Sequence, residues 1–90
     1  MPDTAERVLR DLGRKVAELR RRGALTQEQL AEALDVTVQY LQRVEAGREN
    51  LTVRSLVRLG QHLGVGPGEL FGTPLTRKSR PGRPRTKQPG

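Results

Sequence analysis

Two short amphipathic patterns separated by a single break constrain this chain more than any other feature. They occupy residues 25–47, LTQEQLAEALDVTVQYLQRVEAG. Apolar residues recur at helical spacing before and after LDVT, and a threonine stands at the N-cap position of each half. Two helices joined by a turn of three or four residues cross at roughly 90 to 120°. The segment therefore predicts a tight pair of crossed helices.

Similar signals predict helices on both sides of this pair, and no segment shows the alternation typical of a strand. Asp3 and Glu6 have capping-box spacing and open a first helix. Thr52 and Gly64 bound a fourth helix, and residues 67–71 supply a last helical turn. The side chains expected to face inward are Leu9, Leu12, Val16, Leu19, Leu30, Ala31, Leu34, Leu41, Val44, Leu56, Val57, Leu59 and Leu63. The predicted fold class is all-α, a compact bundle of five helices.

Charge is divided unevenly along the 90 residues. Residues 1–72 hold eleven basic and all ten acidic side chains, a net charge of +1, whereas residues 73–90 hold six basic side chains and no acidic one. In the second stretch only Leu75 is apolar and larger than proline, so burial cannot offset the entropy lost on ordering. We therefore expect a folded domain over 1–72 and a disordered basic tail over 73–90. Such a tail is typical of an arm that contacts polyanions, although added solubility is an alternative role.

The chain lacks the residues that most catalytic and metal sites require. It has no cysteine and a single histidine, His62, and it shows no phosphate-binding loop, zinc-ligand spacing or paired-carboxylate site. We therefore expect neither an enzyme nor a bound cofactor or metal, and a structural role for His62. With no long apolar run and no signal-peptide pattern, the sequence predicts a cytoplasmic protein without membrane contact.

The second helix of the crossed pair carries side chains suited to DNA base edges. Leu41 and Val44 are expected to face inward. The outer side then carries Val38, Gln39, Gln42 and Arg43. Glutamine pairs bidentately with adenine and arginine with guanine, and a valine methyl can contact the thymine methyl. Because such a helix pair braces one helix on the DNA backbone and places the other in the major groove, we predict base reading by these side chains. For any one of them alone, a solvated helix face is the alternative.

The region from Leu12 to Phe71 resembles the Cro and phage-repressor type of helix-turn-helix proteins, also called the XRE family. The match runs without a gap through LGRKVAELRRRGALTQEQLAEAL, VTVQYLQRVEAGRENLTVRSL and LGVGPGELF. It implies a lambda-repressor-like domain whose second helix acts as a brace and whose third helix reads DNA. The phosphate contacts that it implies are Gln27, Thr37, Tyr40, Arg48 and Asn50.

Three positions depart from the family pattern, and one of them is Leu51, which stands where proline is common. Asp35 stands where the family usually has glycine, and we expect it to adopt the left-handed conformation at some energetic cost. Val38 replaces a residue that is usually polar, which favours recognition by shape and methyl contact at this position. The resemblance also implies a partly buried ion pair between Arg20 and Glu45, to which we assign a structural role and no DNA contact.

The basic tail contains a shorter resemblance. RPGRPRTK includes Gly82, Arg83 and Pro84, similar to the core of the AT-hook, although Pro81 departs from that motif. An AT-hook lies in a narrow A·T-rich minor groove, where the negative potential attracts arginine. Minor-groove insertion, nonspecific phosphate contact and no DNA role therefore all stay open for the tail. The basic residues concerned are Arg77, Lys78, Arg80, Arg83, Arg85 and Lys87.

These patterns together predict a sequence-specific transcriptional regulator that binds double-stranded DNA. Because one reading helix offers few base contacts, we expect a homodimer on a pseudo-palindromic operator, with the dimer contact around Val65, Leu70 and Phe71. The alternative is an antitoxin-like module in which the same fold binds a partner protein. RNA is disfavoured as a ligand, because a helix cannot read the deep, narrow groove of A-form RNA.

Overall fold

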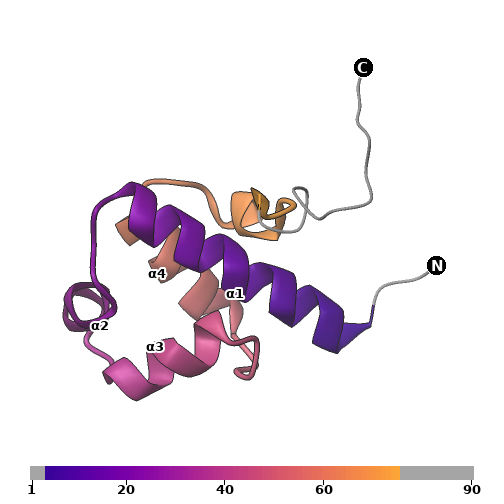
Figure 1. Ribbon diagram of the computed structural model, residues 1–90, viewed down its shortest axis with the longest axis horizontal. Helices are drawn as coiled ribbons and strands as arrows, with labels where there is room; N and C mark the ends of the chain where they lie inside the picture. Colours follow the sequence, from indigo (N-terminus) through magenta and orange to yellow (C-terminus); the bar gives the residue numbers. More distant parts are fainter. Residues whose placement is uncertain (1–3, 76–90) are drawn as a thin grey trace, which may run out of the picture.

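Four α-helices and one 3₁₀ turn make up the computed structural model, which describes residues 4–75 (Figure 1). They are α1 (Ala5–Arg22), α2 (Gln27–Leu34), α3 (Val38–Glu45), α4 (Val53–Leu63) and the turn η1 (Pro67–Phe71). This range contains no strand, and the predicted all-α fold class is confirmed. Within the same range, no helix is long and apolar enough to cross a membrane.

Each α-helix begins after a threonine that caps it. The hydroxyl oxygen of that threonine accepts a hydrogen bond, 3.0–3.1 Å long, from the backbone N–H three residues later. The four caps are Thr4, Thr26, Thr37 and Thr52. At α2 the side chain of Gln29 accepts in turn from the N–H of Thr26 at 2.9 Å, which completes a capping box. The predicted Asp3 cap is wrong, because α1 starts one residue later than expected and the Thr4 hydroxyl makes the capping bond.

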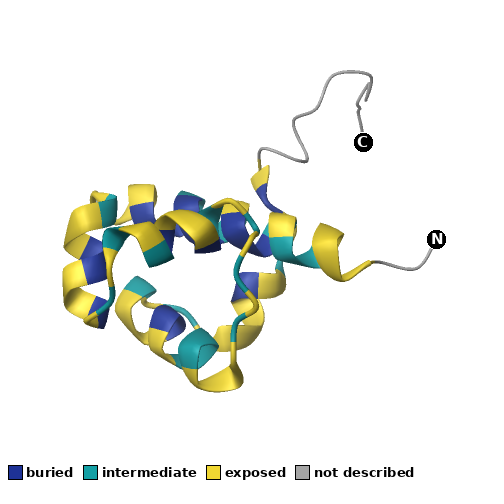
Figure 2. Ribbon diagram, turned by 90° about the horizontal axis from the view of Figure 1, so that it is seen from below, coloured by how far each residue is buried: buried dark blue, intermediate teal, exposed yellow. Residues whose placement is uncertain are grey.

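The inward sides of the helices meet in one apolar core. Its buried members are Leu12, Val16, Leu19, Leu30, Ala31, Leu34, Leu41, Val44, Leu59 and Leu70. α1 packs against α3, α4 and η1, and α2 packs against α3 and α4 (Figure 1). Figure 2 shows the buried residues on the facing sides of the helices and the exposed ones on the outer sides. Of the predicted inward residues, Leu9, Leu56, Val57 and Leu63 are half-buried and the others are buried.

The C-terminal end of the packed domain is formed by η1 and the residues just after it. Leu70, which we predicted near a dimer contact, is 0% exposed, so it belongs to the core and is not available to a second chain. Val65 is half-buried, and Phe71 is 54% exposed. Pro74 is fully buried, so packing continues two residues beyond the predicted boundary at residue 72. The rest of the predicted tail, with its six basic residues and its AT-hook-like motif, lies outside the described residues.

The close approach of α1 to α3 depends on Gly13. A Cβ atom added to Gly13 would lie 2.5 Å from the carbonyl oxygen of Val44 and 2.6 Å from that of Glu45. These distances are shorter than any van der Waals contact, so a side chain at this position would push the two helices apart. Gly13 therefore fixes the spacing at which α1 holds the end of α3.

A buried ion pair joins the same two helices. Arg20 of α1 donates from Nε to Glu45 Oε2 at 2.6 Å and from Nη2 to Oε1 at 3.1 Å, and the two side chains are 9% and 8% exposed. Arg20 Nη1 also donates to the Leu25 carbonyl at 2.8 Å, and Gln27 Nε2 donates to Glu45 Oε1 at 2.9 Å. A bidentate pair with further hydrogen bonds is the arrangement that best offsets the cost of burying two charges. We call these four residues the Glu45 cluster.

We expect Gly13→Ala to lower the free energy of unfolding by about 1–3 kcal/mol, because an extra carbon must enter a fully packed contact. Alanine normally stabilises a helix relative to glycine, so helix propensity alone would predict the opposite change in stability. The control is Gly68→Ala, where an added Cβ meets nothing within 4 Å. Denaturant unfolding measures both variants. If Gly13→Ala were as stable as the wild type, the close contact would be contradicted.

We expect Glu45→Ala to lower the free energy of unfolding by about 3–5 kcal/mol, because it leaves the charge of Arg20 buried without its partner. Thermal and denaturant unfolding measure this loss. Glu32→Ala, at an exposed position of α2, removes the same charge without touching the core and serves as the control. An unchanged melting temperature combined with abolished DNA binding would assign Glu45 to DNA contact and overturn its structural role.

Candidate DNA-binding face

α3 presents a polar strip on the side that faces away from the core. On its inner side Leu41 is 0% exposed and Val44 is 2% exposed. Gln39, Gln42 and Arg43 are exposed and follow one another at helical i, i+3 and i+4 spacing, which places them on one strip of the helix surface. α3 itself lies at the lower edge of the molecule in Figure 1. The three side chains therefore form an accessible polar face, which we call the α3 strip.

The turn between α2 and α3 is held from both sides. Asp35 adopts the left-handed conformation that the sequence predicted, with φ 59° and ψ 47°. The backbone N–H of Val36 donates to the Ala31 carbonyl at 3.0 Å. From α4, Arg58 Nη2 donates to the carbonyl of Leu34, the last residue of α2. These contacts fix the direction in which the chain enters α3.

Val38 and Tyr40 contribute less surface to this face than the three residues of the α3 strip. Both are half-buried and pack against the apolar core. Val38 therefore offers only part of its side chain for the predicted methyl contact. The ring of Tyr40 lies beside Arg43, with 5.8 Å between the ring centroid and the guanidinium carbon. This distance is within the range of a cation–π contact.

The residues predicted to bind phosphate lie at both ends of α3 and at the start of α2. Thr37 precedes α3, and Arg48 and Asn50 follow it; all three are exposed. Gln27 is half-buried, and its amide nitrogen already donates to Glu45. Its backbone N–H, in the first turn of α2, has no acceptor within that helix. The side-chain amide of Gln27 is therefore already used within the domain, whereas its backbone N–H is not used within α2.

Sequence reasoning missed one charged contact on this face. Arg43 Nε donates to Glu49 Oε1 at 2.9 Å, and the two side chains are 52% and 27% exposed. Glu49 lies in the loop between α3 and α4, six residues after Arg43. Ion pairs within a helix are expected at three or four residues apart, so helical periodicity carries no signal for this pair.

Within residues 4–75, no group of three or more possible metal-ligating side chains is close enough to hold an ion. His62 is exposed on α4, and its Nδ1 lies 3.0 Å from the carbonyl of Arg58, one helical turn earlier. The imidazole of His62 is therefore within hydrogen-bonding distance of the backbone of its own helix.

Comparisons with known proteins identify the family of this chain. A family model described as a helix-turn-helix domain matches residues 11–71. An uncharacterized HTH-type transcriptional regulator, y4dJ of Sinorhizobium fredii, is 44% identical over 59 residues, which span 66% of this chain and 77% of that protein.

Solved structures of regulators share the fold. The restriction-modification controller protein C.AhdI from Aeromonas hydrophila is 33% identical with a TM-score of 0.67, over 70% of this chain and 96% of that one. The clp gene regulator ClgR from Corynebacterium glutamicum is 26% identical with a TM-score of 0.68, over 71% of this chain and 68% of that one. The chain thus belongs to the helix-turn-helix family of the Cro and phage-repressor (XRE) type, and it is a transcriptional regulator with a helix-turn-helix DNA-binding fold.

Proposed function

We propose that this regulator recognises a specific DNA sequence by placing α3 in the major groove. The observation that carries the proposal is the α3 strip, an exposed polar face on a helix whose opposite side is fully buried. The Gly13 contact and the Glu45 cluster hold α3 in place, so its outer side is presented without rearrangement of the core. A preformed face of this kind reduces the conformational entropy lost on binding.

Each side chain of the face has a role that follows from its hydrogen-bonding groups. Gln39 and Gln42 would each pair with the edge of an adenine, and Arg43 with that of a guanine. The partly exposed methyl groups of Val38 would contact a thymine methyl. The groups that would bind phosphate are the backbone of Gln27 and the side chains of Thr37, Tyr40, Arg48 and Asn50. Phosphate contacts set the register of α3 on the duplex, and base contacts supply specificity.

We propose further that two copies of the chain bind one operator. Three or four base contacts discriminate poorly among the many sites of a genome, and a dimer doubles their number. The half-sites would then be related by a pseudo-twofold axis, with centres about 34–36 Å apart. Phe71 and Leu75, which are 54% and 58% exposed, are the apolar side chains that the C-terminal end of the domain offers for such a contact.

Selection of bound duplexes from a random DNA pool tests this function. We expect the enriched sequences to form an inverted repeat with half-sites about one helical turn apart. A pool without enrichment would contradict sequence recognition. It would favour instead a module of this fold that binds a partner protein, as an antitoxin does.

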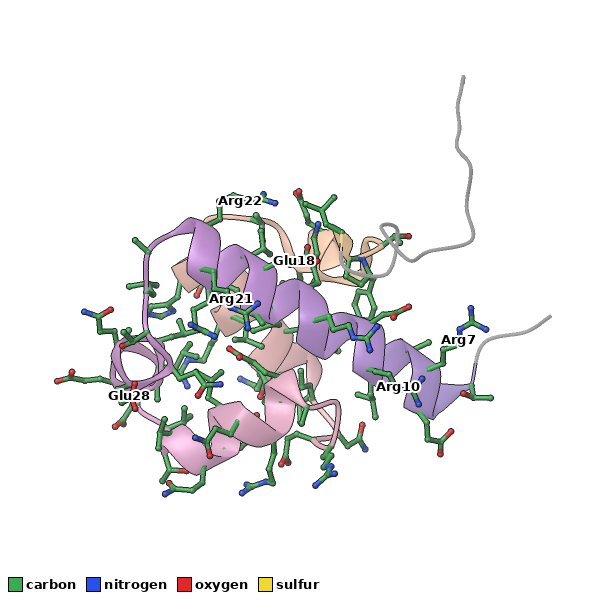
Figure 3. All side chains as sticks on the ribbon, viewed as in Figure 1. Arg7, Arg10, Glu18, Arg21, Arg22 and Glu28 are labelled. Atoms are coloured by element: carbon green, nitrogen blue, oxygen red, sulfur yellow. The ribbon has the colours of Figure 1, made fainter. Side chains whose placement is uncertain are left out.

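On the best selected duplex, we expect Arg43→Ala to weaken binding by about 1–3 kcal/mol and to relax the preference at one base pair in each half-site. Arg22→Ala is the matched control, because Arg22 is an exposed arginine that lies well away from α3 in Figure 3. Binding to the selected and to scrambled duplexes measures both variants. Equal losses on the two DNAs would show that Arg43 contacts phosphate and not a base.

The basic tail is proposed to bind phosphates or the minor groove without changing specificity. Truncation after Leu75 removes all six basic tail residues and keeps the buried Pro74. The slope of log affinity against log salt should become shallower by roughly 0.9 for each phosphate that the tail no longer neutralises. If only part of the tail engages at once, the expected total change is about 2 to 4 per chain. A full-length variant with the six residues changed to glutamine controls for tail length. Equal slopes for all three proteins would assign the tail to solubility or to a protein partner.

A further inference from the structure

The guanidinium of Arg43 contacts two neighbouring side chains, Glu49 and Tyr40. Its Nε donates to Glu49 Oε1 at 2.9 Å, and its carbon lies 5.8 Å from the centroid of the Tyr40 ring. Glu49 is only 27% exposed, whereas Arg43 is 52% exposed. Glu49 is therefore the less exposed member of the pair.

The loop that carries Glu49 is itself fixed to the domain. Gly47 adopts a positive φ of 75°, and a Cβ atom there would lie 2.8 Å from the Cα atom of Arg10. The backbone N–H of Arg48 donates to the carbonyl of Arg43 at 2.8 Å, and that of Gly47 to the carbonyl of Val44 at 3.0 Å. The chain thus turns back along the end of α3. Glu49 reaches Arg43 from a backbone that α1 and α3 together hold in place.

We propose that Glu49 is a positioning residue that directs Arg43 toward a base edge and away from the phosphate backbone. The proposal rests on the DNA-reading function proposed above and assigns Glu49 a part in its specificity. An ion pair this exposed contributes little to the stability of the fold, so its main effect falls on what Arg43 can bind.

The first effect concerns which donors Arg43 has left. An arginine has five N–H donors, and the pairing with Glu49 uses the one on Nε. The donors on the two Nη atoms remain, and they can form the bidentate pair with O6 and N7 of guanine. Because Glu49 and Tyr40 already restrict the side chain, Arg43 loses less rotamer freedom when that pair forms.

The second effect concerns nonspecific DNA. An unpaired arginine on this face would be attracted to any phosphate, whatever the sequence. The carboxylate of Glu49 cancels most of that attraction at long range and repels phosphates that approach closely. When Arg43 contacts a guanine edge, no phosphate needs to lie beside Glu49, so this repulsion does not oppose that contact. The pair therefore lowers nonspecific binding more than specific binding, and the ratio of the two affinities rises.

Glu49→Gln tests this inference, because it keeps the size of the side chain and removes its charge. Glu69→Gln is the control, since Glu69 is an exposed carboxylate on η1, on the other side of the molecule from α3 (Figure 1). Affinity for the selected duplex and for a scrambled duplex is measured across a salt series, and thermal unfolding confirms that both variants fold. We expect Glu49→Gln to bind scrambled DNA more tightly and to lower the specificity ratio on the order of threefold to tenfold. Its salt slope on scrambled DNA should steepen by up to about 0.9 per chain.

A double variant shows whether Glu49 acts through Arg43. In an Arg43→Ala background the further change Glu49→Gln should leave the specificity ratio unaltered, because no arginine remains to be directed. Two results would overturn the inference: Glu49→Gln keeps the wild-type specificity ratio, or it lowers that ratio equally with and without Arg43. Neither result would count against sequence recognition by the wild type. If the wild type itself does not distinguish the two duplexes, the proposed function fails and the inference fails with it.

Discussion

The direction in which α3 faces depends on the buried carboxylate of Glu45. This residue ends α3, and it accepts two hydrogen bonds from Arg20 of α1 and one from Gln27 at the start of α2. An orientation of α3 that broke these bonds would leave charges buried without partners, which is among the costliest changes a small domain can undergo. The same end of α3 rests on the backbone at Gly13. The ion pair of Glu45 and the close packing at Gly13 therefore fix the same end of α3.

α3 separates residues that fold the domain from residues that are available for binding. Leu41, Val44 and Glu45 face the core or its buried ion pair, whereas Gln42 and Arg43, between them in sequence, face outward. Exposed positions away from caps and buried pairs usually change stability by no more than about 0.5 kcal/mol when substituted. The fold therefore places little restriction on the outer residues, and they can be substituted without unfolding the domain.

Local signals in the sequence predicted the helices, apart from the exact start of α1, but not the contacts that form only when the loops and helices pack together. The caps at Thr26, Thr37 and Thr52 could be predicted because capping involves neighbours three residues apart. The buried position of Leu70 and the Arg43–Glu49 pair could not, because both depend on how η1 and the loop after α3 fold back onto the domain. The amide contact of Gln27 with Glu45 was missed because the two residues lie 18 positions apart, one on α2 and one on α3.

We propose that the outer side of α3 meets DNA, and mapping of backbone amide signals by NMR would locate the surface that binds. The ¹⁵N-labelled chain would be titrated with the duplex enriched from the random pool. We expect the largest shift changes on residues 37–50 and on the first turn of α2, with the exposed side of α1 little affected. Changes concentrated on α1 or η1, with α3 unaltered, would contradict it.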